Sequence, residues 1–200
     1  MELVCLDLEG VLVPEIWLGV AERTGIEALK RTTRDEPDYS KLMSGRIEIL
    51  KSHNLTLRDI QEVIGSMKPL PGALDFLDEL RRQTQVIILS DTFHQFSSPL
   101  MSQLGRPTLF CNELVVDKNG TIQDFRLRQP DGKRQAVVAF RTMGLRVTAA
   151  GDSYNDLSMI KEAHRGAFFR PPRSIVEENP TIPVFEEYSS FLSYLKEERR

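Results

Sequence analysis

The sequence predicts an α/β fold in which a mainly parallel sheet is covered by helices on both faces. Three short apolar runs, at 3–6, 86–89 and 146–150, have the length and residue types of buried strands. Segments with apolar residues three and four positions apart lie between these runs, as at 72–82 and 134–143, and this spacing is typical of helices. Strands that alternate with helices pair in parallel and are buried on both faces.

One β-hairpin is expected to interrupt this alternation. The stretches 113–117 and 121–127 flank a turn that contains Asn119-Gly120, and Asn-Gly is a strong signal for chain reversal between two strands. Towards the end of the chain, we expect one more short strand near 181–185, followed by a terminal helix.

The segment 14–69 differs from the rest of the chain because it has helical periodicity and no convincing strand. It follows the first strand and ends where Pro69 and Pro71 stiffen the chain before the next helix. We therefore expect a helical cap domain over 14–69, inserted into a core domain formed by 1–13 and 70–200. The helical patterns of the cap lie at 16–24, 39–53 and 57–67.

Composition narrows the class of protein. The 200 residues, 40% of them hydrophobic, are enough to bury a core without disulfides, and Cys5 and Cys111 form neither a disulfide framework nor a zinc motif. The 26 basic and 29 acidic residues are interspersed, which argues against nucleic-acid and membrane partners. Asp7 lies too near the N-terminus for a signal peptide. We expect a cytoplasmic protein that acts on a small molecule; its oligomeric state stays open.

Each of the three apolar runs is followed by a polar residue. Asp7 follows the first run, Ser90 the second, and Asp152 comes two residues after Ala150 ends the third. Because ligands bind at the carboxyl ends of the strands in an open α/β sheet, we expect these side chains to meet at one rim.

A rim with several carboxylates needs a cation, since neighbouring negative charges repel one another. Mg²⁺ characteristically takes one or two carboxylates together with phosphate oxygens, so we expect it here, with Asp152 as a ligand. Asp156 is four residues further on, so a helix that starts at Ser153 would place Asp152 and Asp156 near the same face. We expect Asp156 beside the metal or near Lys133. The Lys133 ammonium suits a phosphate oxygen, and the Ser90 hydroxyl and the backbone amides of 90–93, at an expected helix start, suit an anion.

The ordered set of motifs resembles the haloacid dehalogenase superfamily. The resemblance rests on Asp7-Leu8-Glu9-Gly10, Ser90, Lys133 and the run Gly-Asp-Ser-Tyr-Asn-Asp at 151–156. The helical insert directly after the first motif resembles the small cap of phosphoserine phosphatases. The chain is similar to the bacterial variant that also transfers phosphate to homoserine, in which Asp-x-Glu-Gly replaces the commoner first motif.

This resemblance implies an aspartyl-phosphate mechanism on phosphoserine. It implies that Asp7 attacks phosphorus and that Glu9 acts as general acid and then as general base. Mg²⁺ would be bound by Asp7, the Glu9 backbone carbonyl and Asp152, while Ser90 and Lys133 bind the phosphate. The neighbouring Asp91, Thr92 and Asn155 are expected at the substrate.

In the predicted cap, the resemblance implies that Arg46 binds the substrate carboxylate and Glu15 its ammonium group. For Arg46 the alternative is a solvated helix face, and for Glu15 an acid that favours a helix N-terminus. The sequence departs from the usual family pattern in three places. Glu9 is longer than the usual aspartate, Gly10 lacks the usual hydroxyl, and Asp91 stands where many relatives have glycine; we expect Asp91 in a local turn.

Two other classes of function remain as alternatives. A response-regulator receiver also combines an aspartate, a Ser or Thr and a lysine with Mg²⁺. However, the aspartate that is phosphorylated in a receiver lies on an interior strand, and no helical insert follows the first strand. Here the candidate nucleophile, Asp7, follows the first strand, and a helical insert comes after it. A relative without catalytic activity could instead bind phosphorylated amino acids. The balance between water and homoserine as the attacking group stays open.

Overall fold

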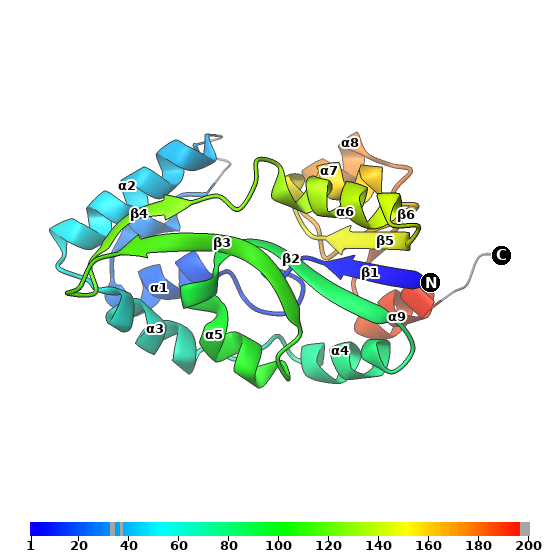
Figure 1. Cartoon of the computed structure of the whole chain (residues 1–200), viewed down its shortest axis with the longest axis horizontal. Coiled ribbons are helices and arrows are strands. Elements are labelled where there is room, and N and C mark those ends of the chain that lie inside the picture. Colours follow the sequence, from blue (N-terminus) through cyan, green and yellow to red (C-terminus); the bar gives the residue numbers. More distant parts are fainter. Residues whose placement is uncertain (33–34, 37, 197–200) are drawn as a thin grey trace.

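In the computed structural model, which describes residues 1–32, 35–36 and 38–196, these residues form a seven-stranded sheet with β1 at its centre (Figure 1). The strand order is β4-β3-β2-β1-β5-β6-β7; β3 and β4 pair antiparallel and all other neighbours pair in parallel. The strands are β1 Glu2–Leu6, β2 Gln85–Phe93, β3 Thr108–Val116, β4 Ile122–Arg126, β5 Arg146–Gly151, β6 Arg165–Phe169 and β7 Val184–Phe185.

Helices cover both faces of the sheet, as predicted. On one face lie α6 (Gly132–Thr142), α7 (Leu157–Glu162) and α8 (Arg173–Glu178) (Figure 1). On the opposite face lie α4 (Ala73–Arg81), α5 (His94–Gln103) and α9 (Tyr188–Lys196). The α/β class with a parallel sheet is therefore confirmed.

The central strand β1 packs against both helical layers. Val4 and Leu6 belong to the hydrophobic cluster on the α4 and α9 side, whereas Leu3 and Cys5 belong to the cluster on the α6 and α7 side. All four side chains are buried. Because successive side chains point to opposite faces, a strand covered on both faces is apolar at every position, and this is the pattern seen in the sequence.

The chain between β1 and α4 forms the helical insert expected from the sequence. Two of its helices begin at capping residues: Asp38 accepts hydrogen bonds from the amides of Ser40 and Lys41, and Thr56 forms a capping box with Asp59. The elements are α1 Ile16–Thr24, the 3₁₀ helix η1 Glu27–Lys30, α2 Tyr39–Ser52 and α3 Leu57–Ser66.

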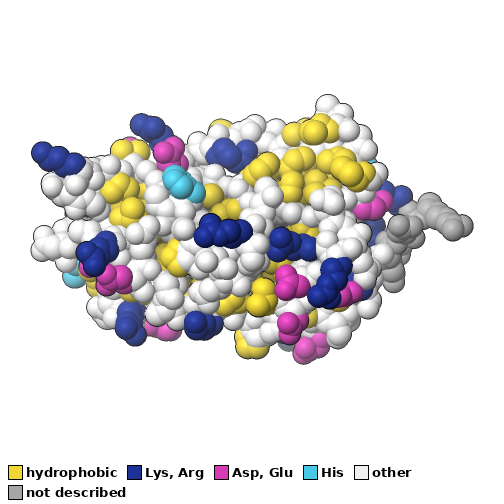
Figure 2. Space-filling view, turned by 60° about the horizontal axis from the view of Figure 1, so that its bottom comes forward, with side chains coloured by type: hydrophobic (Ala, Val, Ile, Leu, Met, Phe, Trp, Pro, Cys, Tyr) yellow, Lys and Arg dark blue, Asp and Glu magenta, His cyan; other side chains and the backbone are white. Residues whose placement is uncertain are grey.

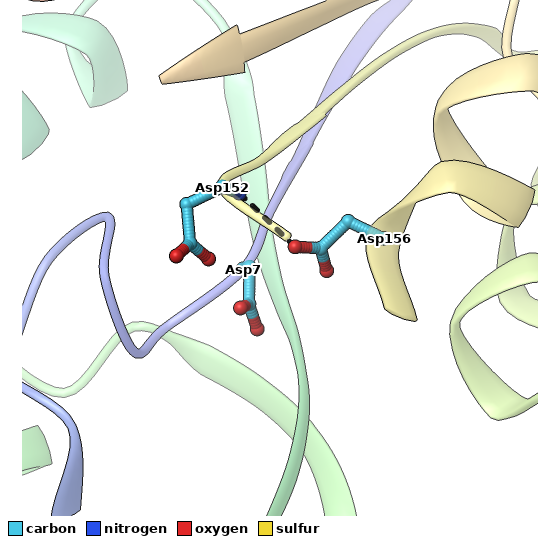
Figure 3. A group of neighbouring side chains, drawn as sticks. All are labelled: Asp7, Asp152 and Asp156. Atoms are coloured by element: carbon cyan, nitrogen blue, oxygen red, sulfur yellow. Dashed lines mark hydrogen bonds between the residues drawn. The ribbon is translucent and has the colours of Figure 1, made fainter. Parts of the chain in front are cut away.

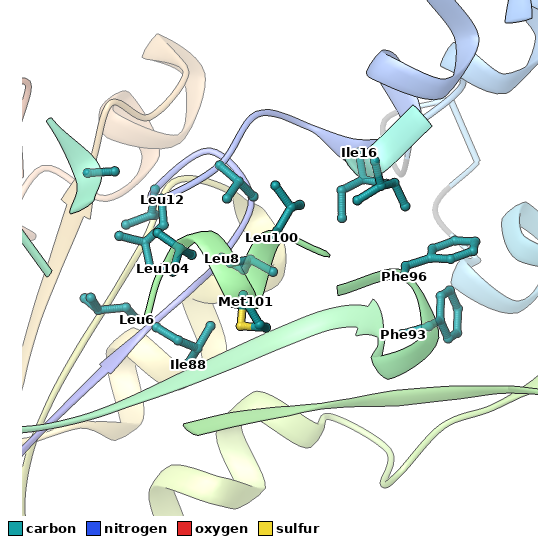
Figure 4. Packing of buried hydrophobic residues seen from close by; sticks show 14 of the residues in the cluster. Leu6, Leu8, Leu12, Ile16, Ile88, Phe93, Phe96, Leu100, Met101 and Leu104 are labelled. Carbon is teal, nitrogen blue, oxygen red and sulfur yellow. The ribbon is translucent and has the colours of Figure 1, made fainter. Parts of the chain in front are cut away.

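The insert and the sheet share apolar packing. One hydrophobic cluster runs from Leu6 at the end of β1 through Leu12 and Ile16 to Phe96 of α5 (Figure 4). The Trp17 ring meets the Phe96 ring edge-on, with 5.6 Å between their centroids. The division into a core over 1–13 and 70–200 and a cap over 14–69 stays a prediction.

The predicted hairpin is present, and it touches the insert. Its first strand begins at Thr108, earlier than expected, because the first half of β3 pairs in parallel with β2 before the second half pairs with β4. At the turn, the Gly120 carbonyl accepts a hydrogen bond from the Leu57 amide at the start of α3, at 2.8 Å. The hairpin therefore links the sheet to the inserted helices.

Strand β2 extends beyond the predicted 86–89 and ends at Phe93. Its register against β3 shifts between Leu89 and Phe93, so the three residues from Ser90 to Thr92 form an irregular strand end. The expectation that Asp91 lies in a turn is wrong, because it belongs to this strand. Strand β6, which begins with polar Arg165, was not predicted, and neither was the six-residue helix α8, which is too short to show a period.

The surface agrees with the charge pattern of the sequence. On the face shown in Figure 2, basic and acidic side chains are interspersed. None of the helices in the described part of the chain combines the length and the apolar character that crossing a membrane requires.

Candidate active site

Three carboxylates meet at the rim of the sheet where the strand order reverses. Asp7 follows β1, and Asp152 follows the neighbouring strand β5, with which β1 pairs through Leu6 and Ala150. Asp7, Asp152 and Asp156 offer carboxylate oxygens that lie within 4.8 Å of one another (Figure 3). The predicted convergence of Asp7 and Asp152 is therefore seen, and it lies at the switch point where open α/β sheets bind ligands.

Asp156 organises the loop after β5. Its Oδ2 accepts hydrogen bonds from the amides of Asp152 at 3.0 Å and Ser153 at 3.1 Å, while its Oδ1 accepts one from Lys133. The predicted helix start at Ser153 is wrong in detail, since a 3₁₀ turn, η2 (Tyr154–Asp156), precedes α7. A Cβ at Gly151 would lie 2.2 Å from Asp156 Cγ, so glycine is required there.

Lys133, in the first turn of α6, is the cation at the centre of the cluster. Its Nζ donates to Asp7 Oδ1 at 2.9 Å and to Asp156 Oδ1 at 2.6 Å, and it lies 3.6 Å from Asp91 Oδ2. Burial lowers the pKa of Lys133, but the carboxylates of Asp156, Asp7 and Asp91 outweigh burial and keep that pKa well above its usual value. Lys133 is therefore a charged ammonium group inside an acidic pocket.

The acids outnumber this single lysine. Burial and the Asp156 carboxylate raise the pKa of Asp7 well above its usual value, although Lys133 opposes them. Burial, followed by Asp156, raises the pKa of Asp152 to about 7. The Asp152 carboxylate forms no hydrogen bond with another residue in the described part of the chain. A divalent cation fits this site, because it would relieve the repulsion and use the free oxygens of Asp7 and Asp152.

Contacts in the structure explain the two residues of the first motif that depart from the usual family pattern, Glu9 and Gly10. Glu9 Oε2 accepts a hydrogen bond from the Ile16 amide at 2.8 Å, so the longer side chain reaches the start of α1. Burial, followed by the Glu15 carboxylate, raises the pKa of Glu9 to about 8. Gly10 has φ +75°, and a Cβ there would lie 2.4 Å from Asp152 Oδ2. A hydroxyl side chain at position 10 would collide with Asp152.

The irregular end of β2 lies beside Lys133. Ser90 and Thr92 are buried, and the Thr92 amide donates to Ser90 Oγ at 3.2 Å. The Asp91 carboxylate accepts a hydrogen bond from Asn155 Nδ2 at 2.8 Å. Asn155 therefore contacts Asp91 in the structure, and its expected contact with substrate stays a prediction.

Arg46 lies inside the insert and is not on a solvated helix face. Its side chain stacks over the Trp17 ring, with Cζ 4.6 Å from the ring centroid, and Nη2 donates to the Arg31 carbonyl at 2.6 Å. Arg46 Nε is buried and has no hydrogen-bond partner among the described residues. Burial lowers the pKa of Arg46 to about 10, against the opposing charges of Tyr39, Glu9 and Glu15.

Glu15 is exposed at the N-cap of α1 and forms no side-chain hydrogen bond with a described residue. Its carboxylate contributes to the raised pKa values of Glu9 and Asp152, so it lies near enough to repel both carboxylates. Sequence reasoning missed one more residue here, Tyr39 at the start of α2. Its hydroxyl donates to the Asp91 carbonyl at 2.8 Å, and no sequence pattern relates position 39 to position 91.

Comparisons with known proteins agree with this geometry. Residues 1–164 match the family model of haloacid dehalogenase-like hydrolases. The chain belongs to this family. It is 56% identical to the phosphoserine phosphatase ThrH of Pseudomonas aeruginosa, over 94% of this chain and 92% of that protein. It is also 53% identical to a phosphoserine phosphatase of Pseudomonas syringae pv. tomato, over 94% of this chain and 79% of that protein.

Solved structures of this hydrolase family show the same fold. A phospho-aspartyl intermediate analogue of phosphoserine phosphatase superposes with a TM-score of 0.79 at 22% identity and covers 96% of this chain and 98% of its own. A substrate-bound phosphoserine phosphatase complex gives a TM-score of 0.79 over 96% of this chain and 97% of its own. Family membership excludes the receiver alternative.

Proposed function

We propose that the protein is a Mg²⁺-dependent phosphoserine phosphatase that forms a phosphoryl intermediate on Asp7. The observation that carries this proposal is the position of Asp7, which shares a buried pocket with one ammonium group, Lys133, and with the unbonded carboxylate of Asp152. The names of the two Pseudomonas relatives support the reaction and the substrate. An intact set of reactive groups also argues against a relative that only binds.

Asp7, Asp152 and the Glu9 backbone carbonyl are the proposed Mg²⁺ ligands. When bound, Mg²⁺ neutralises the excess carboxylate charge and polarises the phosphoryl group. Asp156 has a different role in this proposal, because hydrogen bonds already occupy both of its oxygens. It fixes Lys133 and the loop that carries Asp152.

The protein residues account for the bond changes. Asp7 attacks phosphorus, which forms the Asp7–phosphorus bond and breaks the bond between phosphorus and the serine oxygen. Lys133 and Ser90 bind the phosphoryl oxygens, and the Thr92 amide orients the Ser90 hydroxyl. Glu9, whose pKa of about 8 keeps it protonated at neutral pH, gives its proton to the departing serine oxygen. Glu9 then takes a proton from the attacking water. The water oxygen bonds to phosphorus and the Asp7–phosphorus bond breaks, so phosphate is released and Asp7 is restored.

The insert supplies groups for the amino-acid part of phosphoserine. The Arg46 guanidinium has a buried Nε without a partner, and a planar guanidinium suits a carboxylate. The Glu15 carboxylate, exposed at the start of α1, is the proposed partner of the substrate ammonium group. Asp91 and Asn155 contact each other at the edge of the same pocket and are proposed to border the substrate.

Transfer to homoserine uses the same intermediate and differs only in the attacking hydroxyl. The test is to incubate the protein with phosphoserine and Mg²⁺, with and without homoserine, and to measure free phosphate and phosphohomoserine. We expect Mg²⁺-dependent release of phosphate. If homoserine is also an acceptor, adding it will produce phosphohomoserine and lower the amount of free phosphate. No phosphate release and no phosphohomoserine would contradict the proposed function.

A further inference from the structure

The backbone carbonyl of Asp91 is bonded from two directions. Tyr39 Oη donates to it at 2.8 Å, and Asn112 Nδ2 donates to it at 3.0 Å. Asn112 is buried on β3, and its own Oδ1 accepts a hydrogen bond from the Arg128 amide at 3.0 Å, which fixes the orientation of its side-chain amide. Two donors use both lone pairs of the carbonyl, so its direction is defined.

The direction of this carbonyl also sets the direction of the next amide. In a trans peptide the C=O and N–H groups point to opposite sides of the chain, and the Asp91–Thr92 peptide is trans. The Thr92 N–H accordingly points away from Tyr39 and Asn112 and donates to Ser90 Oγ at 3.2 Å. Ser90 is proposed to bind the phosphate through its hydroxyl. The two donors thus fix an amide that holds Ser90 Oγ.

The two donors come from different parts of the molecule. Asn112 belongs to the sheet, whereas Tyr39 is the first residue of α2 in the helical insert. The Tyr39 ring also packs edge-on against Phe125 of β4, with 6.0 Å between the centroids, so ring packing and hydroxyl contribute separately. We infer that Tyr39 is a positioning residue, whose hydroxyl holds the Asp91–Thr92 peptide so that the Thr92 amide keeps the Ser90 hydroxyl oriented towards the phosphoryl group.

This inference rests on the proposed function and adds a link between insert and phosphate. A donor that is already aimed stabilises a charged transition state without rearranging during the reaction. Without the Tyr39 hydroxyl, the Asp91 carbonyl is bonded by Asn112 alone, and the peptide gains freedom to rotate. We therefore expect weaker binding of a transition-state mimic and a lower kcat, with little change in KM, because the lost interaction serves the transition state.

The test uses Tyr39→Phe, which removes the hydroxyl and keeps the ring. Tyr194→Phe is the matched control, because Tyr194 Oη also donates to a backbone carbonyl, that of Gly166, at 2.9 Å. Gly166 lies near the start of β6, away from the rim that carries Asp7. Orthovanadate binding in the presence of Mg²⁺ is measured by calorimetry, and kcat and KM are measured with phosphoserine.

We expect Tyr39→Phe to weaken orthovanadate binding and to lower kcat by about 3- to 10-fold each, and Tyr194→Phe to change neither by more than about twofold. Orthovanadate binding by Tyr39→Phe equal to that of the wild type would overturn the inference, as would equal losses in both variants. Because orthovanadate needs no knowledge of the natural ester, weaker binding without any phosphoserine turnover would support Tyr39 and contradict only the substrate.

Discussion

The two halves of the candidate site are built differently. At the sheet rim, Lys133 and Asp156 are buried and their charged atoms are bonded to one another or to backbone amides. In the insert, Arg46 retains a buried Nε without a partner, and Glu15 is exposed and makes no side-chain hydrogen bond with a described residue. The comparison indicates that the fold alone organises the half proposed to bind phosphate, whereas the half proposed to bind the amino-acid group keeps groups that a substrate could bond.

Removing the nucleophile is the strongest test of the phosphate half. We expect Asp7→Asn to lower turnover of phosphoserine by about 10⁴-fold or more, because the amide cannot form the phosphoryl intermediate. Turnover is measured by phosphate release, with Asp75→Asn, an exposed acid on α4, as the control. Near-normal activity of Asp7→Asn would show that another residue is the nucleophile.

Glu9 joins the two halves, because it is proposed to move a proton and also caps α1. We expect Glu9→Gln to slow turnover by about 10²–10⁴-fold, the usual contribution of general acid–base catalysis. The glutamine oxygen can still accept the Ile16 amide hydrogen, so the melting temperature should change little. The control is Glu22→Gln on the exposed side of α1. An unchanged rate would remove Glu9 from the mechanism.

For the amino-acid half, Arg46 is the decisive residue. We expect Arg46→Ala to raise KM for phosphoserine by about 10- to 100-fold, because a hydrogen-bonded charge pair is lost. KM for p-nitrophenyl phosphate, which has no carboxylate, should change far less. Arg58→Ala, an exposed arginine on α3, is the control. Equal changes for both substrates would contradict the assignment of Arg46.

The smallest expected effect concerns stability without metal. The pKa of Asp152 in the folded protein, about 7, lies above that of an unfolded aspartate, about 3.9, so the folded state binds the proton more tightly. Asp152 therefore favours folding at low pH and loses that contribution as the pH rises towards its folded pKa.

We expect the metal-free wild type to lose more melting temperature between about pH 5 and about pH 8 than Asp152→Asn loses, by a few degrees. Mg²⁺ should restore the wild type at the higher pH and have a smaller effect on the variant. Thermal unfolding with and without Mg²⁺ measures both. Identical pH profiles for the two proteins would show that Asp152 is not destabilised by its neighbours.

Much of the fold and of the phosphate half could be predicted, because both depend on local patterns. The apolar run before Asp7 identified the central strand, and the rule that parallel strands present their carboxyl ends at one rim brought Asp152 to it. Apolar spacing likewise predicted α1, α2 and α3 with ends that differ by at most one residue from those observed.

The contacts across the site could not be predicted, because they depend on side-chain reach and on close approach in space. Glu9 reaches the Ile16 amide, and a side chain at Gly10 would strike Asp152, yet the sequence shows only departures from a family pattern. Asp91 was expected in a local turn, but it lies in β2. Its place in β2 depends on a register shift, and its contact with Tyr39 on the way that α2 lies against the hairpin.

The central claim is that Asp7 carries the phosphoryl group in a pocket shared with Lys133 and Asp152. The most direct measurement is to quench the protein with acid during turnover of ³²P-labelled phosphoserine and to locate the label by peptide mapping. We predict Mg²⁺-dependent, alkali-labile label on the peptide that contains Asp7, and none in Asp7→Asn. Label on a different peptide, or equal labelling of Asp7→Asn, would contradict the account.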